Sequence, residues 1–173
     1  MKKILMFSLI VATLFICLKS FAQEDKSKRP SPPAKVSETT SNGNSISIDY
    51  SQPSVKGRTI GKEIAPFDKV WRTGANEATL FEISKAAKIN GKYPLAAGKY
   101  GLYSIPGEKN WTIIFNKTWK QWGTEYNEGD DALRVVTETG KAPSATEKMT
   151  FNISKDGKIT LLWGIYSVSF TVS

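Results

Sequence analysis

The chain of 173 residues contains no histidine and a single cysteine, Cys17. Without imidazole or a second thiol, it cannot form a Ser-His-Asp triad, a Cys-His nucleophile pair, a zinc site of the usual ligands or an internal disulfide. Calcium could still bind to oxygen ligands, but no D-x-[DN]-x-[DN]-G loop is present. The composition therefore favours binding over catalysis, and we expect no metal and no cofactor.

Long hydrophobic runs are also scarce, since the only one extends from Ile4 to Leu18. It follows Met1-Lys2-Lys3 and precedes Ser20-Phe21-Ala22, an order typical of a secretory signal peptide over residues 1–22. About 15 apolar residues are few for a membrane span, which needs about 20. We expect an exported protein, periplasmic or extracellular, with no membrane span after cleavage. A retained N-terminal anchor and lipidation of Cys17 are the alternatives.

Acidic residues are outnumbered by basic ones, 16 to 24, which gives a formal net charge of +8. Residues 1–22 hold three lysines and no acids, so cleavage leaves +5. Part of this excess lies in residues 23–35, a Pro/Lys-rich stretch that we expect to form a flexible arm. A mild basic excess favours anionic surfaces. Export and the absence of a nucleic-acid-binding motif exclude nucleic acid as a partner.

After residue 35 the sequence changes to short runs in which apolar and polar residues alternate, the period of a half-buried strand. Ile46, Ile48 and Tyr50 show the pattern clearly, with Ser47 and Asp49 between them. Strands are predicted at residues 36–40, 46–50, 79–83, 87–89, 99–105, 111–115, 133–137, 149–153, 159–163 and 166–172.

Turn signals separate these runs. Ser41-Asn42-Gly43-Asn44, Asn90-Gly91 and Asp156-Gly157 each predict a β-hairpin. The best helical turn lies at Thr118–Tyr126, where a glycine interrupts it. About eight to ten short strands predict an all-β fold over residues 36–173, a single antiparallel β-sandwich or barrel-like domain.

The stretch from Pro66 to Thr79 has an unusual composition for a loop. It holds four candidate ligand-binding residues: Trp71, Arg72, Asn76 and Glu77. A guanidinium beside an indole can bind a carboxylate, phosphate or sulfate through two parallel hydrogen bonds, and Asn76 could bind a sugar hydroxyl. In the structural alternative, Arg72 pairs with Glu77 or Asp68 inside its own loop and Asn76 caps backbone groups.

Three further residues extend this candidate site. Arg58 stands in a Gly/Pro-rich connection suited to an anion, although a solvated turn explains the same residues. Trp122 forms an aromatic group with Trp119 and Tyr126, which can stack on sugar rings or close one end of the fold as core. Tyr50 completes the candidates.

Carboxylates offer the one catalytic alternative. A glycoside hydrolase needs two of them, roughly 5–9 Å apart. Glu77 could meet Asp130 or Asp131 if their loops share one end of the fold, but solvated acids explain the same residues. We predict no catalytic residue.

Several sequence blocks occur in a recognisable order. They are Arg29-Pro30-Ser31-Pro32, Ile48-Asp49-Tyr50-Ser51-Gln52-Pro53, Val55-Lys56-Gly57-Arg58, Val70-Trp71-Arg72-Thr73-Gly74-Ala75-Asn76-Glu77-Ala78-Thr79, Pro94-Leu95-Ala96-Ala97-Gly98-Lys99-Tyr100, and Trp111-Thr112-Ile113-Ile114-Phe115-Asn116 followed by Trp122-Gly123. Together they resemble a bacterial family of exported proteins, the domain of unknown function number 2911, over about Arg29 to Val172. The resemblance implies a signal peptide, an envelope or extracellular address and a β-rich domain, and it implies no activity and no catalytic residue.

We therefore expect a non-catalytic binding or envelope-associated module whose partner is a small polar or anionic ligand, with a glycan as one candidate. The alternatives are a structural or protein-interaction domain, in which the Trp71–Glu77 block serves the fold, and a carboxylate-based hydrolase of carbohydrate.

Overall fold

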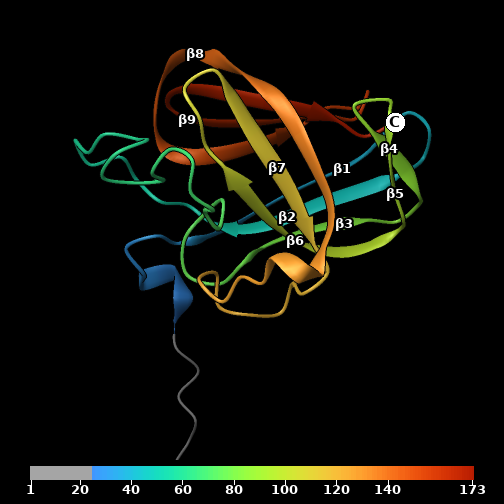
Figure 1. Ribbon diagram of the computed structural model, residues 1–173, viewed down its shortest axis with the longest axis horizontal. Helices are drawn as coiled ribbons and strands as arrows, with labels where there is room; N and C mark the ends of the chain where they lie inside the picture. Colours follow the sequence, from blue (N-terminus) through green and yellow to red (C-terminus); the bar gives the residue numbers. More distant parts are fainter. Residues whose placement is uncertain (1–24) are drawn as a thin grey trace, which may run out of the picture.

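The structure is a computed structural model that describes residues 25–173, so the expected signal peptide lies outside the described range. A seven-stranded antiparallel sheet with the order β1-β2-β3-β6-β7-β8-β9 curls on itself, and β4 and β5 form a separate two-stranded sheet (Figure 1). The strands are β1 (Pro33–Thr39), β2 (Ser45–Ser51), β3 (Thr79–Ile83), β4 (Ala87–Ile89), β5 (Tyr93–Leu95), β6 (Gly98–Ile105), β7 (Asn110–Asn116), β8 (Asp131–Ile153) and β9 (Lys158–Thr171). The predicted all-β fold is confirmed.

Helical structure in the described range is limited to two 3-10 turns, η1 (Lys26–Lys28) and η2 (Glu128–Asp130). Within residues 25–173, no helix has the length and hydropathy needed to cross a membrane.

Alternation along the strands forms the core as predicted. Ile48 of β2 lies opposite Phe81 of β3, which lies opposite Tyr100 of β6, and all three side chains are buried. Residues directly opposite one another in an antiparallel pair point to the same face of the sheet. The concave face is therefore continuously apolar. Ile114 points to the other face of central strand β7 and is also buried.

The last two strands are longer than the sequence pattern predicted. The runs at 133–137 and 149–153 belong to the single strand β8, and those at 159–163 and 166–172 belong to β9 and its end. Register shifts between Lys141 and Thr150 carry the ladder through a polar stretch that resembles a loop in sequence. Gly164, at φ +56°, bends β9 so that the hydroxyls of Thr160 and Ser169 lie 2.9 Å apart.

The bent β8–β9 hairpin closes the curled sheet over its concave face. The Met149 N–H donates to the Pro53 carbonyl at 2.9 Å, and the Val55 N–H donates to the Glu147 carbonyl at 2.9 Å. The far half of β8 is thereby joined to the chain that leaves β2. Hairpin side chains that complete the core are Met149, Phe151, Ile159, Leu161 and Trp163.

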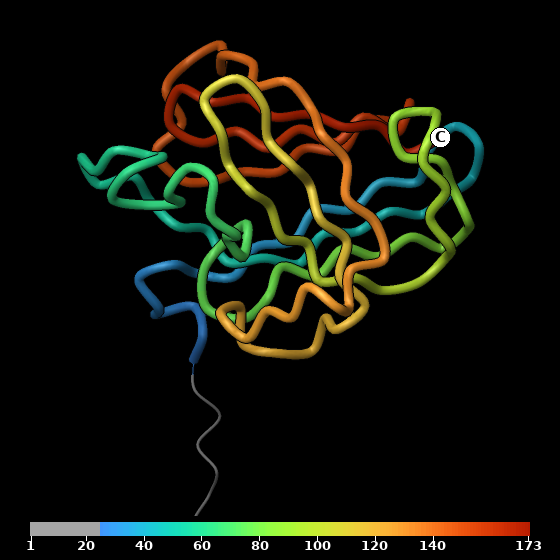
Figure 2. The backbone as a smooth tube through the Cα atoms, viewed as in Figure 1, coloured from blue at the N-terminus to red at the C-terminus, as the bar shows by residue number. Residues whose placement is uncertain are grey.

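The expected helical turn at Thr118–Tyr126 does not form. Residues 117–130, here the 117–130 loop, lie against the outer face of the sheet, beside the segment that precedes β3 (Figure 2). Beneath the loop is a second, small apolar cluster of Ala78, Tyr103 and Ile114 with Tyr126 packed on it. Hydrogen bonds to another segment, rather than to its own turns, satisfy part of the loop backbone.

The described residues of the expected arm contact the domain. β1 begins at Pro33, three residues before the expected domain boundary, because the Gln52 N–H donates to the Pro32 carbonyl at 2.9 Å and extends the β1–β2 pairing. The described part of the arm, Asp25–Pro32, lies against the domain through Lys26 and Arg29.

Ending the chain at Ile165 should unfold the domain. The deletion removes the buried side chains Val168, Phe170 and Val172, each of which contributes roughly 1.5–3 kcal/mol of burial. Domains of this size are stable by about 5–15 kcal/mol, so most of the free energy of unfolding is lost. Thermal melting followed by circular dichroism measures this.

Removing Ser173 alone is the control, because it deletes only hydrogen bonds with the Lys88 backbone, two from the Ser173 backbone and one from its hydroxyl, and should lower the midpoint by a few degrees. An unchanged midpoint after truncation at Ile165 contradicts the prediction.

Candidate functional site

Trp71 anchors the segment that precedes β3. Its indole stacks on Trp163 at 5.1 Å and 9°, and meets Trp111 edge-on at 6.0 Å. Its backbone pairs with Ser104 of β6 through hydrogen bonds of 2.7 and 2.9 Å. The indole is thus a partly buried member of the core, and its packing supports the structural interpretation of this residue.

Two residues after Trp71 the backbone turns in a way that few L-residues adopt. Thr73 has φ +46° and Asn76 has φ +61°; such conformations cost of order 1–3 kcal/mol each. Buried Thr73 donates a hydrogen bond to the Ser104 hydroxyl at 2.9 Å, and its carbonyl accepts one from the Thr79 hydroxyl at 2.9 Å. The Asn76 amide donates to the Ser31 carbonyl at 3.0 Å. These bonds hold the segment in one shape.

The segment and the 117–130 loop form a common wall. The Gly123 N–H donates to the Asn76 carbonyl at 3.0 Å, the Ala78 N–H donates to the Gln121 carbonyl at 3.1 Å, and Glu77 forms a β-bridge with Trp122. A hollow lies on each side of this wall.

The first hollow, the Arg72 groove, has a volume of about 480 Å³. It is lined by Val70, Trp71, Arg72, Tyr103, Gly123, Thr124 and Tyr126. The pairing of Arg72 with Glu77 or Asp68 that the sequence allowed is not found. Within the described residues the Arg72 side chain has no hydrogen bond and no ion pair, and its Nε is shielded from solvent without an acceptor.

Tyrosine rings form one side of the Arg72 groove. The Tyr126 ring lies 4.9 Å from that of Tyr103, and its hydroxyl donates to Asp131 at 2.7 Å and accepts from Arg134 at 2.8 Å. Burial and the Asp131 hydrogen bond raise the pKa of Tyr126 to about 12. Burial likewise raises the pKa of Tyr103. Both hydroxyls therefore stay neutral near pH 7, and Arg72 meets no phenolate.

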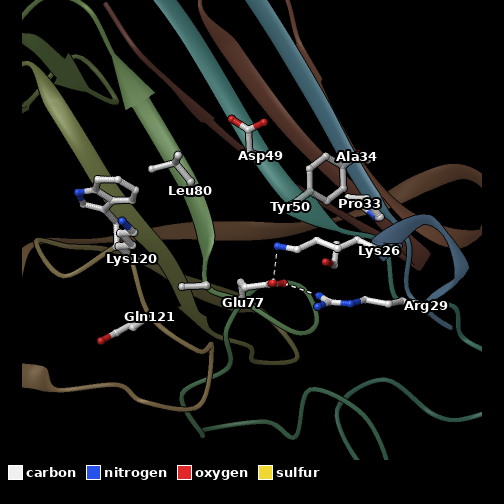
Figure 3. Close-up of a pocket in the computed structure, with 13 residues that line it drawn as sticks. Lys26, Arg29, Pro33, Ala34, Asp49, Tyr50, Glu77, Leu80, Lys120 and Gln121 are labelled. Atoms are coloured by element: carbon white, nitrogen blue, oxygen red, sulfur yellow. Dashed lines mark hydrogen bonds and ion pairs between the residues drawn. The ribbon is translucent and has the colours of Figure 1, made fainter. Parts of the chain in front are cut away.

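The second hollow, the Glu77 pocket, has a volume of about 450 Å³ (Figure 3). Leu80, Ala78 and Pro33 give it apolar surface, and Trp119, Lys120 and Gln121 come from the 117–130 loop. Lys26 and Arg29 of the arm reach the Glu77 carboxylate from the opposite side (Figure 3). This pocket therefore combines apolar surface with a charged end.

Two cations share the Glu77 carboxylate. Lys26 Nζ lies 2.7 Å from Oε1, and Arg29 Nη1 lies 2.8 Å from Oε2. Partial burial opposes ionisation, but the hydrogen bonds from Lys26, from the backbone N–H of Glu77 itself and from Arg29 outweigh it and lower the pKa of Glu77 to about 2. Glu77 is therefore ionised near pH 7.

The structure separates the candidate residues rather than gathering them. Arg72 and Trp71 line the groove, whereas Glu77 and Tyr50 line the pocket. Buried Tyr50 accepts a hydrogen bond from the Phe151 N–H at 3.2 Å and so also serves the core.

The remaining candidates lie outside both hollows. Asn76 bonds within the fold, and the Arg58 guanidinium donates to the carbonyls of Ser54 and Val55 at 2.7 and 3.1 Å. Trp122 is 44% exposed but lines neither hollow.

Sequence reasoning missed Lys26, Arg29 and Tyr103 as lining residues. The arm cations stand about 50 positions from Glu77 in a stretch expected to be flexible, so no local signal connected them. Tyr103 alternates to the outer face of β6, and only the position of the 117–130 loop shows that it is covered.

The carboxylate pair that a hydrolase needs is not assembled at Glu77. Asp131 bonds Arg134 and Tyr126, Asp130 accepts from Thr118, and neither lines the Glu77 pocket. Among residues 25–173 no three acidic side chains gather as potential metal ligands.

Substitution of Gly123 by alanine should destabilise the domain. An added Cβ would stand 2.4 Å from Arg72 Cδ and 2.8 Å from the Asn76 carbonyl oxygen, and such overpacking costs roughly 1–3 kcal/mol. In Gly129→Ala, a matched change in the same loop, the nearest atom is 3.4 Å away. Urea denaturation should separate the two variants, and equal midpoints would disprove the close packing of this wall.

The ion pairs of Glu77 should make stability depend on pH below about 4.5. Because the folded-state pKa is lowered, their contribution is complete above the ordinary glutamate pKa and is lost as the pH falls toward 2. Glu77→Gln should flatten this part of a plot of urea midpoint against pH. The effect is small because the carboxylate is 39% exposed. A plot identical to that of the wild type would contradict the assignment.

Comparison with known proteins identifies the family of the chain. No curated protein and no solved structure matches it. One family model, described as a protein of unknown function (DUF2911), matches residues 31–172. This range covers both strands of the hairpin that closes the sheet, and all the groove residues. The chain therefore belongs to the DUF2911 family.

Proposed function

We propose that this protein is exported and is a binding module that holds an anionic ligand in the Arg72 groove. One observation carries the proposal: a guanidinium without any partner among the described residues lines a hollow of about 480 Å³. A shielded N–H without an acceptor costs about 1–3 kcal/mol, and an anion that aligns the guanidinium recovers part of that cost.

The lining of the groove selects among anions. A guanidinium binds carboxylate, phosphate or sulfate through paired hydrogen bonds, whereas the rings of Tyr103 and Tyr126 offer apolar contact. A ligand that joins an anionic group to a ring fits both. Acidic sugars such as uronic acids have this chemistry and occur where exported proteins function.

Hydrolysis receives no support at Glu77. A general acid must be protonated near its working pH, and a general base needs a pKa close to it. With a pKa of about 2 and two cations on its carboxylate, Glu77 meets neither requirement.

A structural role for the segment is the second candidate, and the packing of Trp71 favours it. Trp71 stacks on Trp163 while Thr73 and Asn76 bond within the fold. Arg72 differs from these three residues because its side chain forms neither a ring contact nor a hydrogen bond within the described residues. Trp71, Thr73 and Asn76 therefore fit the structural role, and Arg72 fits ligand binding. Replacement of Arg72 distinguishes the two roles.

Arg72→Gln should weaken binding of glucuronate by roughly 10- to 100-fold, the equivalent of the 1.5–3 kcal/mol that charge-assisted hydrogen bonds contribute. Heteronuclear NMR titration with glucuronate, sulfate and neutral glucose measures the affinities and maps the site. Arg58→Gln is the matched control, since Arg58 lies outside the groove.

The thermal midpoint of Arg72→Gln should stay within a few degrees of the wild type. If no anion perturbs the groove resonances, or if Arg72→Gln melts far lower, Arg72 serves the fold and the binding proposal is wrong.

A further inference from the structure

The Glu77 pocket has a property that anion binding at Arg72 does not use. Its charged end is filled by two side chains from one short stretch of the arm, Lys26 and Arg29, which meet the two carboxylate oxygens separately. Both side chains end in a cation on a long apolar stem. They line the pocket and reach Glu77 as side chains of a bound basic peptide would (Figure 3).

The body of the domain supplies the rest of the pocket. Glu77, Leu80 and the Trp119–Gln121 segment all lie within the family match at residues 31–172, whereas Lys26 and Arg29 precede it. The carboxylate and the apolar surface thus lie inside the matched range, whereas the two cations precede it.

The shape of the pocket fits a cation carried on an apolar stem. The stems of lysine and arginine pack on apolar surface while their charged ends reach a partner. Here Leu80 and Ala78 provide the surface and Glu77 the partner. Lys120, on the loop side of the pocket, disfavours a compact polycation and favours a single charged end directed at Glu77.

The arm is held by contacts that can exchange. The Lys26 and Glu77 side chains are 52% and 39% exposed, and exposed ion pairs contribute about 0.2–1 kcal/mol. Arg29 is better buried, with 13% of its side chain exposed. An external ligand of the same chemistry can therefore compete with the arm.

We propose that the Glu77 pocket binds a guanidinium or ammonium group on an apolar stem, as in a basic peptide segment, and that Lys26 and Arg29 occupy this site within the chain. The ionised state of Glu77 near neutral pH supports this assignment. The site is distinct from the Arg72 groove in position and in the charge of its ligand, so it does not depend on the anion-binding proposal.

The test compares four full-length mature proteins by isothermal titration calorimetry at low ionic strength. They are the wild type, the Lys26→Ala/Arg29→Ala variant, the same variant with Glu77→Gln, and Lys28→Ala. Lys28 is the matched control, because it pairs with Asp25 and leaves Glu77 untouched. The probes are argininamide, a peptide with the sequence of residues 25–32, and the same peptide with glutamine in place of Lys26 and Arg29.

We expect the Lys26→Ala/Arg29→Ala variant to bind the peptide at least 5-fold more tightly than the wild type and than Lys28→Ala. Adding Glu77→Gln should abolish this gain, and the glutamine peptide should not bind. Circular dichroism melts confirm that all four proteins are folded.

The proposal is overturned by any of three results: equal affinity in the wild type and the arm variant, undiminished binding after Glu77→Gln, or equal binding of the glutamine peptide and the basic peptide. Argininamide should reproduce the order of affinities, since the guanidinium alone provides the charge. If the glutamine peptide binds as well as the basic one, the arm contact depends on apolar surface and not on the carboxylate.

Discussion

The stacking of Trp71 between the sheet and the closing hairpin is the contact on which both hollows depend. Trp163 comes from β9 and Trp111 from β7, so the indole joins the hairpin to the sheet that it covers. Its backbone is paired with Ser104 at the same time. Because both the indole and the backbone of Trp71 are held, the segment that follows it begins at a fixed position and in a fixed direction. Arg72, directly after it, cannot move far from the outer face of β6.

From this fixed point the segment reaches β3 through two left-handed residues. Thr73 and Asn76 separate Arg72 from Glu77 and turn the chain between them. The backbone pairing of residues 76–78 with 121–123 then forms a wall, with the guanidinium lining one side and the carboxylate lining the other. Arg72 and Glu77 are five residues apart, so even in a regular strand their side chains would point to opposite faces.

The strands could be predicted because alternation is local. Residues of β2, β3, β6 and β7 show the period of a half-buried strand, and the Asn90-Gly91 and Asp156-Gly157 turns were predicted and join the expected strands. The length of β8 could not be predicted, because bulges carry its ladder through a polar stretch. Charge pairing was the least predictable feature. Glu77 has partners about 50 residues upstream, and only the position of β1 beside β2 brings the arm to the pocket.

The Glu77 carboxylate has ion-pair partners and the Arg72 guanidinium has none among the described residues, and this difference bears on what each hollow is suited to bind. Glu77 has a pKa of about 2 because hydrogen bonds from two cations stabilise its carboxylate, and these cations come from the arm that precedes β1. Arg72 has no acidic partner among the described residues, although Glu125 lies in the 117–130 loop and Asp131 directly follows it. The Asp131 carboxylate is instead bonded by Arg134 and Tyr126. Lys26 and Arg29 of the same chain thus pair with Glu77, whereas no described side chain pairs with Arg72. An external anion therefore meets less competition at Arg72 than an external cation meets at Glu77.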